Sequence, residues 1–269
     1  MDNIRIAAAI TNSPLNQITR NMSAVRSWVA SAREKGAAII CFPELNISGY
    51  STKDEIKASA QKIPGPVSDE LIQIASDHQI VILAGMTEKS GEGQIFASHL
   101  VVSPGKLSGI YRKLHIAPPE QSIFTPGDSI PLFDVRNIKF GIQLCYDAHF
   151  PELSTRMATE GADIIFMPHA SPRGIPSAKF TSWMRHLTAR AFDNGLFIVA
   201  CNQTGKNGNG LEFPGLAVVI GPTGEVLKKK LADEEGLLIV DLKADDLSYV
   251  RHHRMRYFLP NRRPEIYFS

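Results

Sequence analysis

Apolar and polar positions follow two different periods along this chain. Short apolar runs bounded by turn residues predict buried strands, whereas apolar residues three and four positions apart predict amphipathic helices. The first helical pattern begins at Leu15 and ends at Gly36, which supplies a C-terminal stop. The predicted helices span residues 15–36, 68–78, 151–161 and 180–195, and the predicted strands span residues 4–10, 37–44, 79–86, 138–145, 162–168, 196–202 and 236–242, with hairpins at 94–113 and 215–229.

The order of these elements predicts the fold class. Strands alternate with helices early in the chain, and hairpins follow in the middle and near the end, one of them around Pro104 and Gly105. Ser68 is the expected N-cap of the second helix. The pattern favours a layered α/β domain with mixed sheets over a purely parallel one. No repeat or linker divides residues 1–269, so we expect a single domain.

Composition narrows the class of protein. The chain has 269 residues, of which 43% are hydrophobic and 21% charged, as is typical of a globular protein with a sizeable core. A net charge of +2 gives no reason to expect nucleic acid or an anionic membrane as a partner. No apolar run reaches the roughly 18 residues of a membrane span, and the N-terminal run is too short for a signal peptide.

The cysteines indicate a reducing compartment. Cys41, Cys145 and Cys201 are widely spaced, which is not a disulfide framework, and no Cys-x-x-Cys pair suggests a metal or redox site. We therefore expect a cytoplasmic protein without a metal ion. The Gly-rich stretch at 204–210 lacks the glycine spacing and the following helix of a phosphate loop, so we expect a surface loop and no cofactor.

Three polar residues stand at the ends of predicted strands. Glu44 ends CFPE, Lys113 ends GIYRK and Cys145 ends GIQLC. Sites in layered α/β folds form beyond the carboxyl ends of strands, which favours one shared site. Cys145 also precedes a helix that begins at Pro151, so it lies at a strand-to-helix turn. Each residue alone has a simpler explanation, as a solvated glutamate, a surface lysine or a small core cysteine.

Together the three residue types form a coherent set for acyl transfer. A thiol is a weak nucleophile until it loses its proton, and a carboxylate in a partly desolvated cleft can take that proton. A buried lysine would lower the pKa of the thiol and donate to an oxyanion, and the backbone N–H of Tyr146 would complete the oxyanion hole. The sequence thus predicts a Cys–Glu–Lys site without the histidine of papain-like proteases.

Three motifs resemble signatures of the nitrilase, or carbon–nitrogen hydrolase, superfamily. The stretches CFPELNISGY, YRKLHI and GIQLCYDAHFPE resemble its first, second and third signatures, in that order and at suitable separations. The GPTGEVL hairpin and the RRPEIY tail also match habits of the family. The resemblance covers nearly the whole chain.

The resemblance implies a fold, an assembly and residue roles. The fold would be an αββα sandwich that pairs with a second subunit into an αββα–αββα homodimer, with residues 245–269 as an arm on the partner. Cys145 would be the nucleophile, Glu44 the general base and Lys113 the oxyanion stabiliser. Glu120, in EQSIFTPGD, resembles the second glutamate of amidase-type members and would hold the Lys113 ammonium in place.

The residues after Cys145 bear on the reaction. Nitrile-cleaving members have Trp-Glu after the cysteine, whereas Tyr146 and Asp147 resemble the branches that cleave amides or N-carbamoyl amines. The resemblance therefore implies a thiol amidohydrolase that acts on a small linear amide or N-carbamoyl amine and releases ammonia. A nitrilase proper and an acyltransferase would use the same residues. A non-catalytic binding subunit or a plain scaffold remains an alternative, although neither needs all three polar residues.

Three further residues are candidates for substrate contact. N-carbamoyl-amino-acid hydrolases carry arginines a few residues after the cysteine, where this chain has His149. An imidazole is only partly charged near neutral pH, so it would hold a carboxylate weakly. Arg173, in PHASPRG, could supply the positive charge instead, and His169 could hydrogen-bond the substrate. Each is equally well explained as a surface or structural residue.

Overall fold

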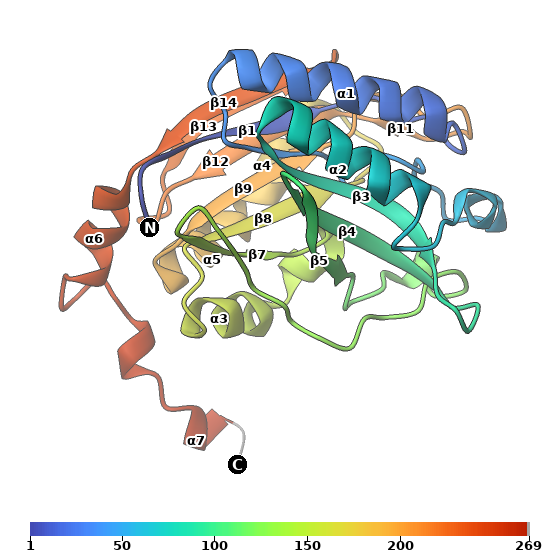
Figure 1. Ribbon diagram of the computed structural model, residues 1–269. Coiled ribbons are helices and arrows are strands. Elements are labelled where there is room, and N and C mark those ends of the chain that lie inside the picture. Colours follow the sequence, from blue (N-terminus) through green and yellow to red (C-terminus); the bar gives the residue numbers. More distant parts are fainter. Residues whose placement is uncertain (268–269) are drawn as a thin grey trace.

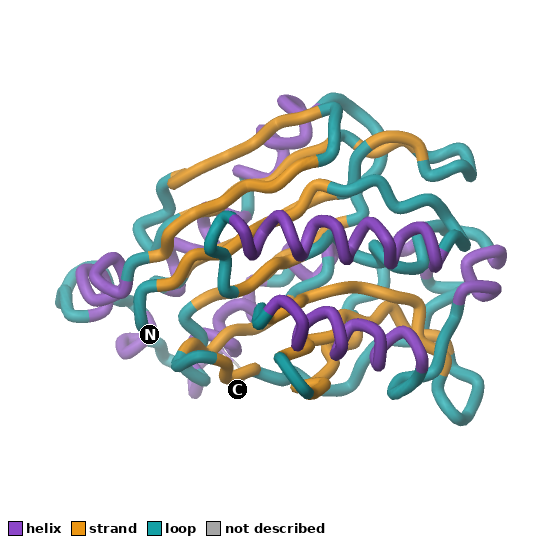
Figure 2. Tube along the Cα trace, turned by 45° about the horizontal axis from the view of Figure 1, so that its top comes forward, coloured by secondary structure: helices purple, strands orange, loops and turns teal. Residues whose placement is uncertain are grey.

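The computed structural model describes residues 1–267 of the chain. Two six-stranded sheets pack face to face, and helices cover the outer face of each sheet (Figure 1). Figure 2 shows the two long helices α1 (Ile18–Glu34) and α2 (Pro66–His78) side by side across one of these outer faces. This arrangement confirms the predicted αββα sandwich.

The first sheet has mixed strand directions. Its order is β14-β1-β2-β3-β4-β5, in which β1, β2 and β3 are parallel and the remaining pairs antiparallel. The hairpin predicted around Pro104 and Gly105 joins β4 to β5. The strands span Ile4–Ile10 (β1), Ile39–Cys41 (β2), Val81–Lys89 (β3), Ile95–Ser103 (β4), Lys106–Arg112 (β5) and Gly236–Leu242 (β14).

The second sheet repeats this plan. Its order is β13-β12-β9-β8-β7-β6, with β7, β8 and β9 parallel at the centre. A separate two-stranded ribbon pairs β10 with β11, so the stretch predicted as a plain loop at 204–210 contains one short strand. The strands span Phe133–Val135 (β6), Ile138–Ile142 (β7), Ile164–His169 (β8), Phe197–Asn202 (β9), Gly205–Lys206 (β10), Glu212–Phe213 (β11), Gly215–Ile220 (β12) and Val226–Ala232 (β13).

Shorter helices cover the second sheet and form the end of the chain. The α-helices are α3 (Pro151–Thr159), α4 (Pro176–Met184), α5 (Leu187–Asn194), α6 (Ala244–Arg251) and α7 (Pro264–Tyr267), and the 3-10 helices are η1 (Asp54–Ser59), η2 (Pro118–Glu120), η3 (Cys145–His149) and η4 (Leu259–Asn261). None of the helices within residues 1–267 combines the length and the apolar character needed to cross a bilayer.

Strand β1 shows why the layers form. Its side chains point alternately to the two faces of the sheet, as in any β-strand. Ile6 and Ala8 join the apolar cluster between the two sheets, whereas Ala7 and Ala9 join the cluster beneath α1 and α2. All four are fully buried. An unbroken apolar run is therefore required here, because both faces of the strand are covered.

The helix predicted over residues 180–195 is in fact two helices. The helix is interrupted at Arg185 and His186. Their backbone N–H groups donate to the carbonyls of Ser182 and Trp183, three residues earlier in each case, at 3.3 and 3.1 Å. The Thr188 hydroxyl then donates to the Met184 carbonyl at 2.7 Å. The apolar spacing continues across the break because both helices bury the same face, so periodicity alone does not reveal it.

The N-cap predicted for the second helix was also wrong. Helix α2 begins two residues earlier, with Gly65 as its N-cap and Pro66 in the first turn. The Ser68 hydroxyl accepts from the Gly65 N–H at 2.9 Å and donates to the Gly65 carbonyl at 2.8 Å. Ser68 thus closes the capping turn from inside the helix.

The C-terminal segment leaves the sandwich. Figure 1 shows α6 at one edge of the molecule and α7 well away from both sheets. Several large apolar side chains of this arm are exposed, among them Met255 at 75% and Tyr267 at 59%. An arm with such side chains suits contact with another surface.

Candidate active site

The structure brings Glu44, Lys113 and Glu120 into direct contact. The Lys113 Nζ lies 2.8 Å from Glu44 Oε1 and 2.8 Å from Glu120 Oε2. All three residues are almost completely buried, at 0%, 1% and 3% exposure. A lone charge would be very unfavourable here, so one ammonium between two carboxyl groups is a compensated arrangement.

Loops beyond three strand ends hold this cluster. Glu44 follows β2, and its other carboxyl oxygen accepts from the Ala170 N–H, just beyond β8, at 3.0 Å. The Gln203 side chain donates to the Glu44 carbonyl at 2.8 Å. Lys113 follows β5, and its N–H donates to the Ala97 carbonyl of β4 at 2.9 Å. Glu44 and Lys113 thus lie together, each beyond the end of its strand.

Glu120 is held by a hydroxyl that the sequence did not single out. The Tyr50 OH donates to Glu120 Oε1 at 2.7 Å, and the Ala117 N–H donates to Oε2 at 3.2 Å. Tyr50 ends the first motif, CFPELNISGY, but nothing in its local pattern indicated a partner 70 residues away. Glu120 and Lys113 are only seven residues apart, so the short loop of η2 returns the carboxylate to its lysine.

Cys145 lies at a strained turn beside this cluster. It opens η3 three residues after the end of β7, and its φ of 45° is in the left-handed region that residues other than glycine rarely adopt. The charges of Glu44, Lys113 and Glu120 all act on the Cys145 thiol, so the four groups lie within electrostatic reach of one another. Cys145 is partly exposed, whereas Cys41 and Cys201 are buried.

Asp147 shapes this turn from beneath, a role that the sequence did not indicate. Its carboxylate accepts from the Leu144 N–H at 2.9 Å, the His115 N–H at 2.8 Å and the Tyr111 OH at 2.8 Å. The residue is fully buried. One side chain therefore ties the cysteine turn to the segment that follows Lys113.

Burial acts differently on the three ionisable groups. Burial raises the pKa of Glu44 to about 7, with Lys113 opposing and Glu120 adding to that effect. Burial alone would lower the pKa of Lys113, but the two carboxylates outweigh it and raise that pKa. Burial, followed by the charge of Glu44, raises the pKa of the Cys145 thiol. Lys113 lowers the thiol pKa by its charge, as expected, but burial and the Glu44 charge outweigh it, and the resting cysteine is protonated.

His169, another candidate residue, lies in a buried and packed position. His169 is buried, its Nδ1 lies 2.7 Å from the Met167 carbonyl, and its ring stacks on Trp183 at 4.0 Å. Burial lowers the His169 pKa to about 3, so its imidazole is neutral. His169 is thus a buried, neutral ring directly before Ala170.

Tyr146 and His149 lie on the turn itself. Their rings are 5.7 Å apart, and His149 also packs against His186 at 4.5 Å. Burial and then the charge of Arg190 lower the His149 pKa. Arg173 is exposed, and its backbone N–H donates to the Glu212 carbonyl at 2.8 Å, so the structure does not bring its guanidinium to the cluster.

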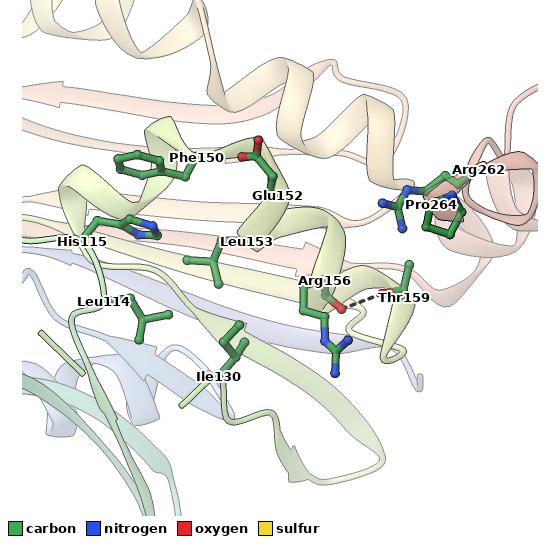
Figure 3. A pocket seen from close by; sticks show the side chains of 10 residues that line it. All are labelled: Leu114, His115, Ile130, Phe150, Glu152, Leu153, Arg156, Thr159, Arg262 and Pro264. Atoms are coloured by element: carbon green, nitrogen blue, oxygen red, sulfur yellow. Dashed lines mark hydrogen bonds between the residues drawn. The ribbon is translucent and has the colours of Figure 1, made fainter. Parts of the chain in front are cut away.

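A separate cavity of about 860 Å³ lies between α3 and the C-terminal arm (Figure 3). Leu114, Phe150 and Leu153 form part of its apolar wall, and Arg262 and Pro264 of the arm close its far side. Glu44, Lys113 and Cys145 do not line it. Within residues 1–267, no group of three or more His, Cys, Asp and Glu side chains is arranged to hold a metal ion.

Comparison with known proteins places the chain among enzymes. The carbon-nitrogen hydrolase family model matches residues 5–252. The chain is 32% identical over 278 residues to a protein named nitrilase from Pyrococcus abyssi, covering 98% of this chain and 99% of that one. It is 29% identical to the N-carbamoylputrescine amidase of Solanum lycopersicum, covering 97% of this chain and 92% of the enzyme.

Solved structures of an amidase from Nesterenkonia sp. AN1 are similar along the whole fold. A glutamate-to-leucine variant matches with a TM-score of 0.84 at 28% identity, covering 98% of this chain and 95% of that one. It carries the acetamide moiety of fluoroacetamide covalently at its active-site cysteine, and a cysteine-to-alanine variant of the same amidase binds butyramide. The chain therefore belongs to the carbon–nitrogen hydrolase family and is an amidase-type enzyme that acts on C–N bonds other than peptide bonds.

Proposed function

We propose that Cys145 is the nucleophile of this amidase, Glu44 its general base and Lys113 its oxyanion stabiliser. The observation that carries the proposal is the buried contact of Lys113 with Glu44 and Glu120 beside the strained Cys145 turn. A base with a pKa near the working pH transfers protons most efficiently, and the pKa of Glu44 is about 7. No histidine takes part in this scheme.

Acylation begins with proton transfer. Glu44 takes the S–H proton of Cys145, and the sulfur attacks the amide carbon while the C=O π electrons move onto oxygen. Lys113 and the Tyr146 N–H donate hydrogen bonds to that oxyanion, because the first N–H groups of η3 have no partner within the helix. Protonated Glu44 then gives its proton to the leaving nitrogen, the C–N bond breaks, and ammonia departs from a thioester on Cys145.

Deacylation repeats these steps with water. Glu44 takes a proton from water, and the resulting oxygen nucleophile attacks the thioester carbon. The C–S bond breaks, the carboxylic acid leaves, and the proton returns to sulfur. Glu120 keeps the Lys113 ammonium in place through both halves, and Tyr50 in turn holds Glu120.

Small linear amides are the proposed substrates. N-carbamoyl amines are the second candidate, because Tyr146 and Asp147 follow the cysteine and an N-carbamoylputrescine amidase is among the relatives. A nitrilase proper or an acyltransferase would form the same thioester. The requirement for a free thiol at Cys145 supports a reducing, cytoplasmic location.

Ammonia release from a substrate panel tests this proposal. The panel contains short aliphatic amides, N-carbamoyl amines and the matching nitriles, each assayed with the wild type, Cys145→Ala and the matched control Cys201→Ala. We expect release from amides that depends on Cys145 and persists in the control. Carbon dioxide formed with the ammonia would select carbamoyl compounds, and turnover by Cys145→Ala would refute the assigned nucleophile.

We further propose that residues 1–269 form one domain that assembles as a homodimer through α3 and the arm at 245–269. The 860 Å³ cavity supports this assembly, because its lining extends from α3 onto Arg262 and Pro264 of the arm. Exposed Met255 and Phe258 lie on the same arm. A partner subunit would cover these side chains and remove apolar area from water.

A further inference from the structure

A second lysine is tied to the loop that holds Glu44 and has no role in the proposed mechanism. Lys179 is half-buried in the first turns of α4. This is an unfavourable place for a cation, because the amino end of a helix carries partial positive charge. Burial adds a desolvation cost that lowers the Lys179 pKa. A charge kept at such a place with only neutral hydrogen-bond partners suggests a ligand.

The ammonium is fixed to the loop that also holds the general base. Lys179 Nζ donates to Ser171 Oγ at 2.9 Å and to the Pro172 carbonyl at 3.0 Å. Ser171 follows Ala170, whose N–H donates to Glu44. The Asn202 side chain of β9 forms two hydrogen bonds with the Ser171 backbone. Its oxygen accepts from the Ser171 N–H at 2.8 Å, and its NH₂ group donates to the Ser171 carbonyl at 3.0 Å. The ammonium is therefore held at a defined place relative to Glu44.

No carboxylate neutralises Lys179 within the described part of the chain. Its two hydrogen-bond partners, a hydroxyl and a carbonyl, are both neutral. An ammonium has three donors, so one is left for another acceptor. Burial lowers the Lys179 pKa, and a negative charge on Cys145 would oppose that effect.

We infer that Lys179 binds a carboxylate at the end of the substrate remote from the scissile amide, so that the preferred substrates are monoamides of dicarboxylic acids. This inference rests on the proposed function of Cys145. A single ammonium matches one negative charge, whereas a phosphate usually needs more donors. Lys179 takes the role that the sequence suggested for Arg173, whose side chain is exposed. The same charge would repel the free amine of an N-carbamoyl diamine.

The alternative is a structural one, in which Lys179 only ties the loop between Ser171 and α4. A structural tether would affect all substrates equally. A carboxylate-binding lysine would affect the KM of charged amides far more than that of neutral amides of similar length. Ser171→Ala removes one tethering hydrogen bond but leaves the charge, so it reports the structural role alone.

The experiment compares glutaramate with hexanamide, using the wild type, Lys179→Gln, Ser171→Ala and the matched surface control Lys62→Gln. We expect Lys179→Gln to lower kcat/KM for glutaramate by roughly 10- to 100-fold, mainly through KM, as is usual when a charged hydrogen bond is lost. The loss for hexanamide should be much smaller. Lys179→Glu should reverse the preference, toward 5-aminopentanamide.

The outcomes separate the two proposals. Equal losses on both substrates, or no loss on glutaramate, would overturn the role of Lys179 while leaving Cys145 chemistry intact. No Cys145-dependent turnover of either amide by the wild type would instead overturn the proposed function. If Lys179→Gln does not fold, the wild type alone tests the inference. Its KM for glutaramate should rise with ionic strength, whereas its KM for hexanamide should stay constant. An equal response of the two KM values would count against the inference.

Discussion

At Glu44, burial and two charged neighbours act in opposite directions on one carboxyl group. Burial and the Glu120 charge favour the protonated form, and Lys113 favours the carboxylate, with a resulting pKa of about 7. The neighbouring thiol stays protonated because burial and the Glu44 charge raise its pKa. The resting site therefore holds a proton on sulfur and a base able to take it. Nucleophile activation is a proton transfer on substrate binding rather than a standing thiolate.

This balance predicts the pH dependence of the reaction. Only the carboxylate form of Glu44 can accept the thiol proton, so kcat/KM should fall as the pH drops through about 7. The negative charge of Glu120 raises the Glu44 pKa, so Glu120→Gln should shift this acid limb to lower pH. Profiles of kcat/KM against pH for the two proteins measure the shift. An acid limb that stays in place or moves to higher pH would contradict the coupling.

Tyr50 offers a second prediction at this scale. Tyr50→Phe removes the 2.7 Å hydrogen bond to Glu120 and leaves a buried carboxyl oxygen without that donor. We expect kcat to fall by roughly tenfold, because a hydrogen bond to a charged group contributes about 1.5–3 kcal/mol. The exposed Tyr249→Phe is the matched control. A wild-type kcat in Tyr50→Phe would show that Glu120 does not depend on this hydroxyl.

At the scale of elements, the site depends on how β7 passes into η3. The left-handed φ of Cys145 costs about 1–3 kcal/mol in general, and the surrounding contacts must maintain it. Asp147 provides them by accepting from the Leu144 N–H on one side and the His115 N–H on the other. Sequence periodicity predicts β7 and α3 but does not predict this turn, because Asp147 acts through partners on another segment.

Replacing Asp147 should therefore damage both stability and reactivity. Asp147→Asn substitutes an NH₂ group for one oxygen of a buried carboxylate that accepts from three donors. We expect the free energy of unfolding to fall by on the order of 2 kcal/mol or more, since buried donors lose their acceptor. Urea unfolding measures this, with exposed Asp134→Asn as control. The Cys145 alkylation rate should fall as well, and stability equal to the wild type would exclude this role for Asp147.

The sequence predicts those elements that depend on interactions between residues close together in the chain. Local periodicity and turn residues predict the strands and the hairpin around Gly105, and the structure contains them. The break at His186 leaves the apolar spacing intact and is missed. Glu44, Lys113 and Cys145 stand out in the sequence because each ends a predicted strand. Tyr50, Asp147 and Lys179 do not, because their roles come only from tertiary contacts.

At the scale of the whole molecule, two sheets hold the site from both sides. Glu44 and Lys113 follow strands of one sheet, and Cys145 and Ala170 follow strands of the other. The hydrogen bond between Ala170 and Glu44 joins the two halves directly. The site is therefore complete only when the sandwich is closed. The arm lies outside this core.

The proposed homodimer gives a prediction at this scale. Met255→Glu places a carboxylate on an arm residue that is 75% exposed, so the folded subunit should tolerate it. A dimer that buries this side chain would instead be weakened by desolvation of the charge. Light scattering after size exclusion should give a dimer mass for the wild type and a monomer mass for the variant. A monomeric wild type, or an unchanged mass in the variant, would count against the arm interface.

The central claim is that Cys145 alone among the three cysteines is activated by the Glu44–Lys113–Glu120 cluster. Peptide mass spectrometry after incubation with fluoroacetamide, in the wild type and in Glu44→Gln, tests it most directly. The account predicts a carbamoylmethyl group on Cys145, none on Cys41 or Cys201, and slower modification in Glu44→Gln. Modification spread over all three cysteines, or confined to Cys41 or Cys201, would contradict it.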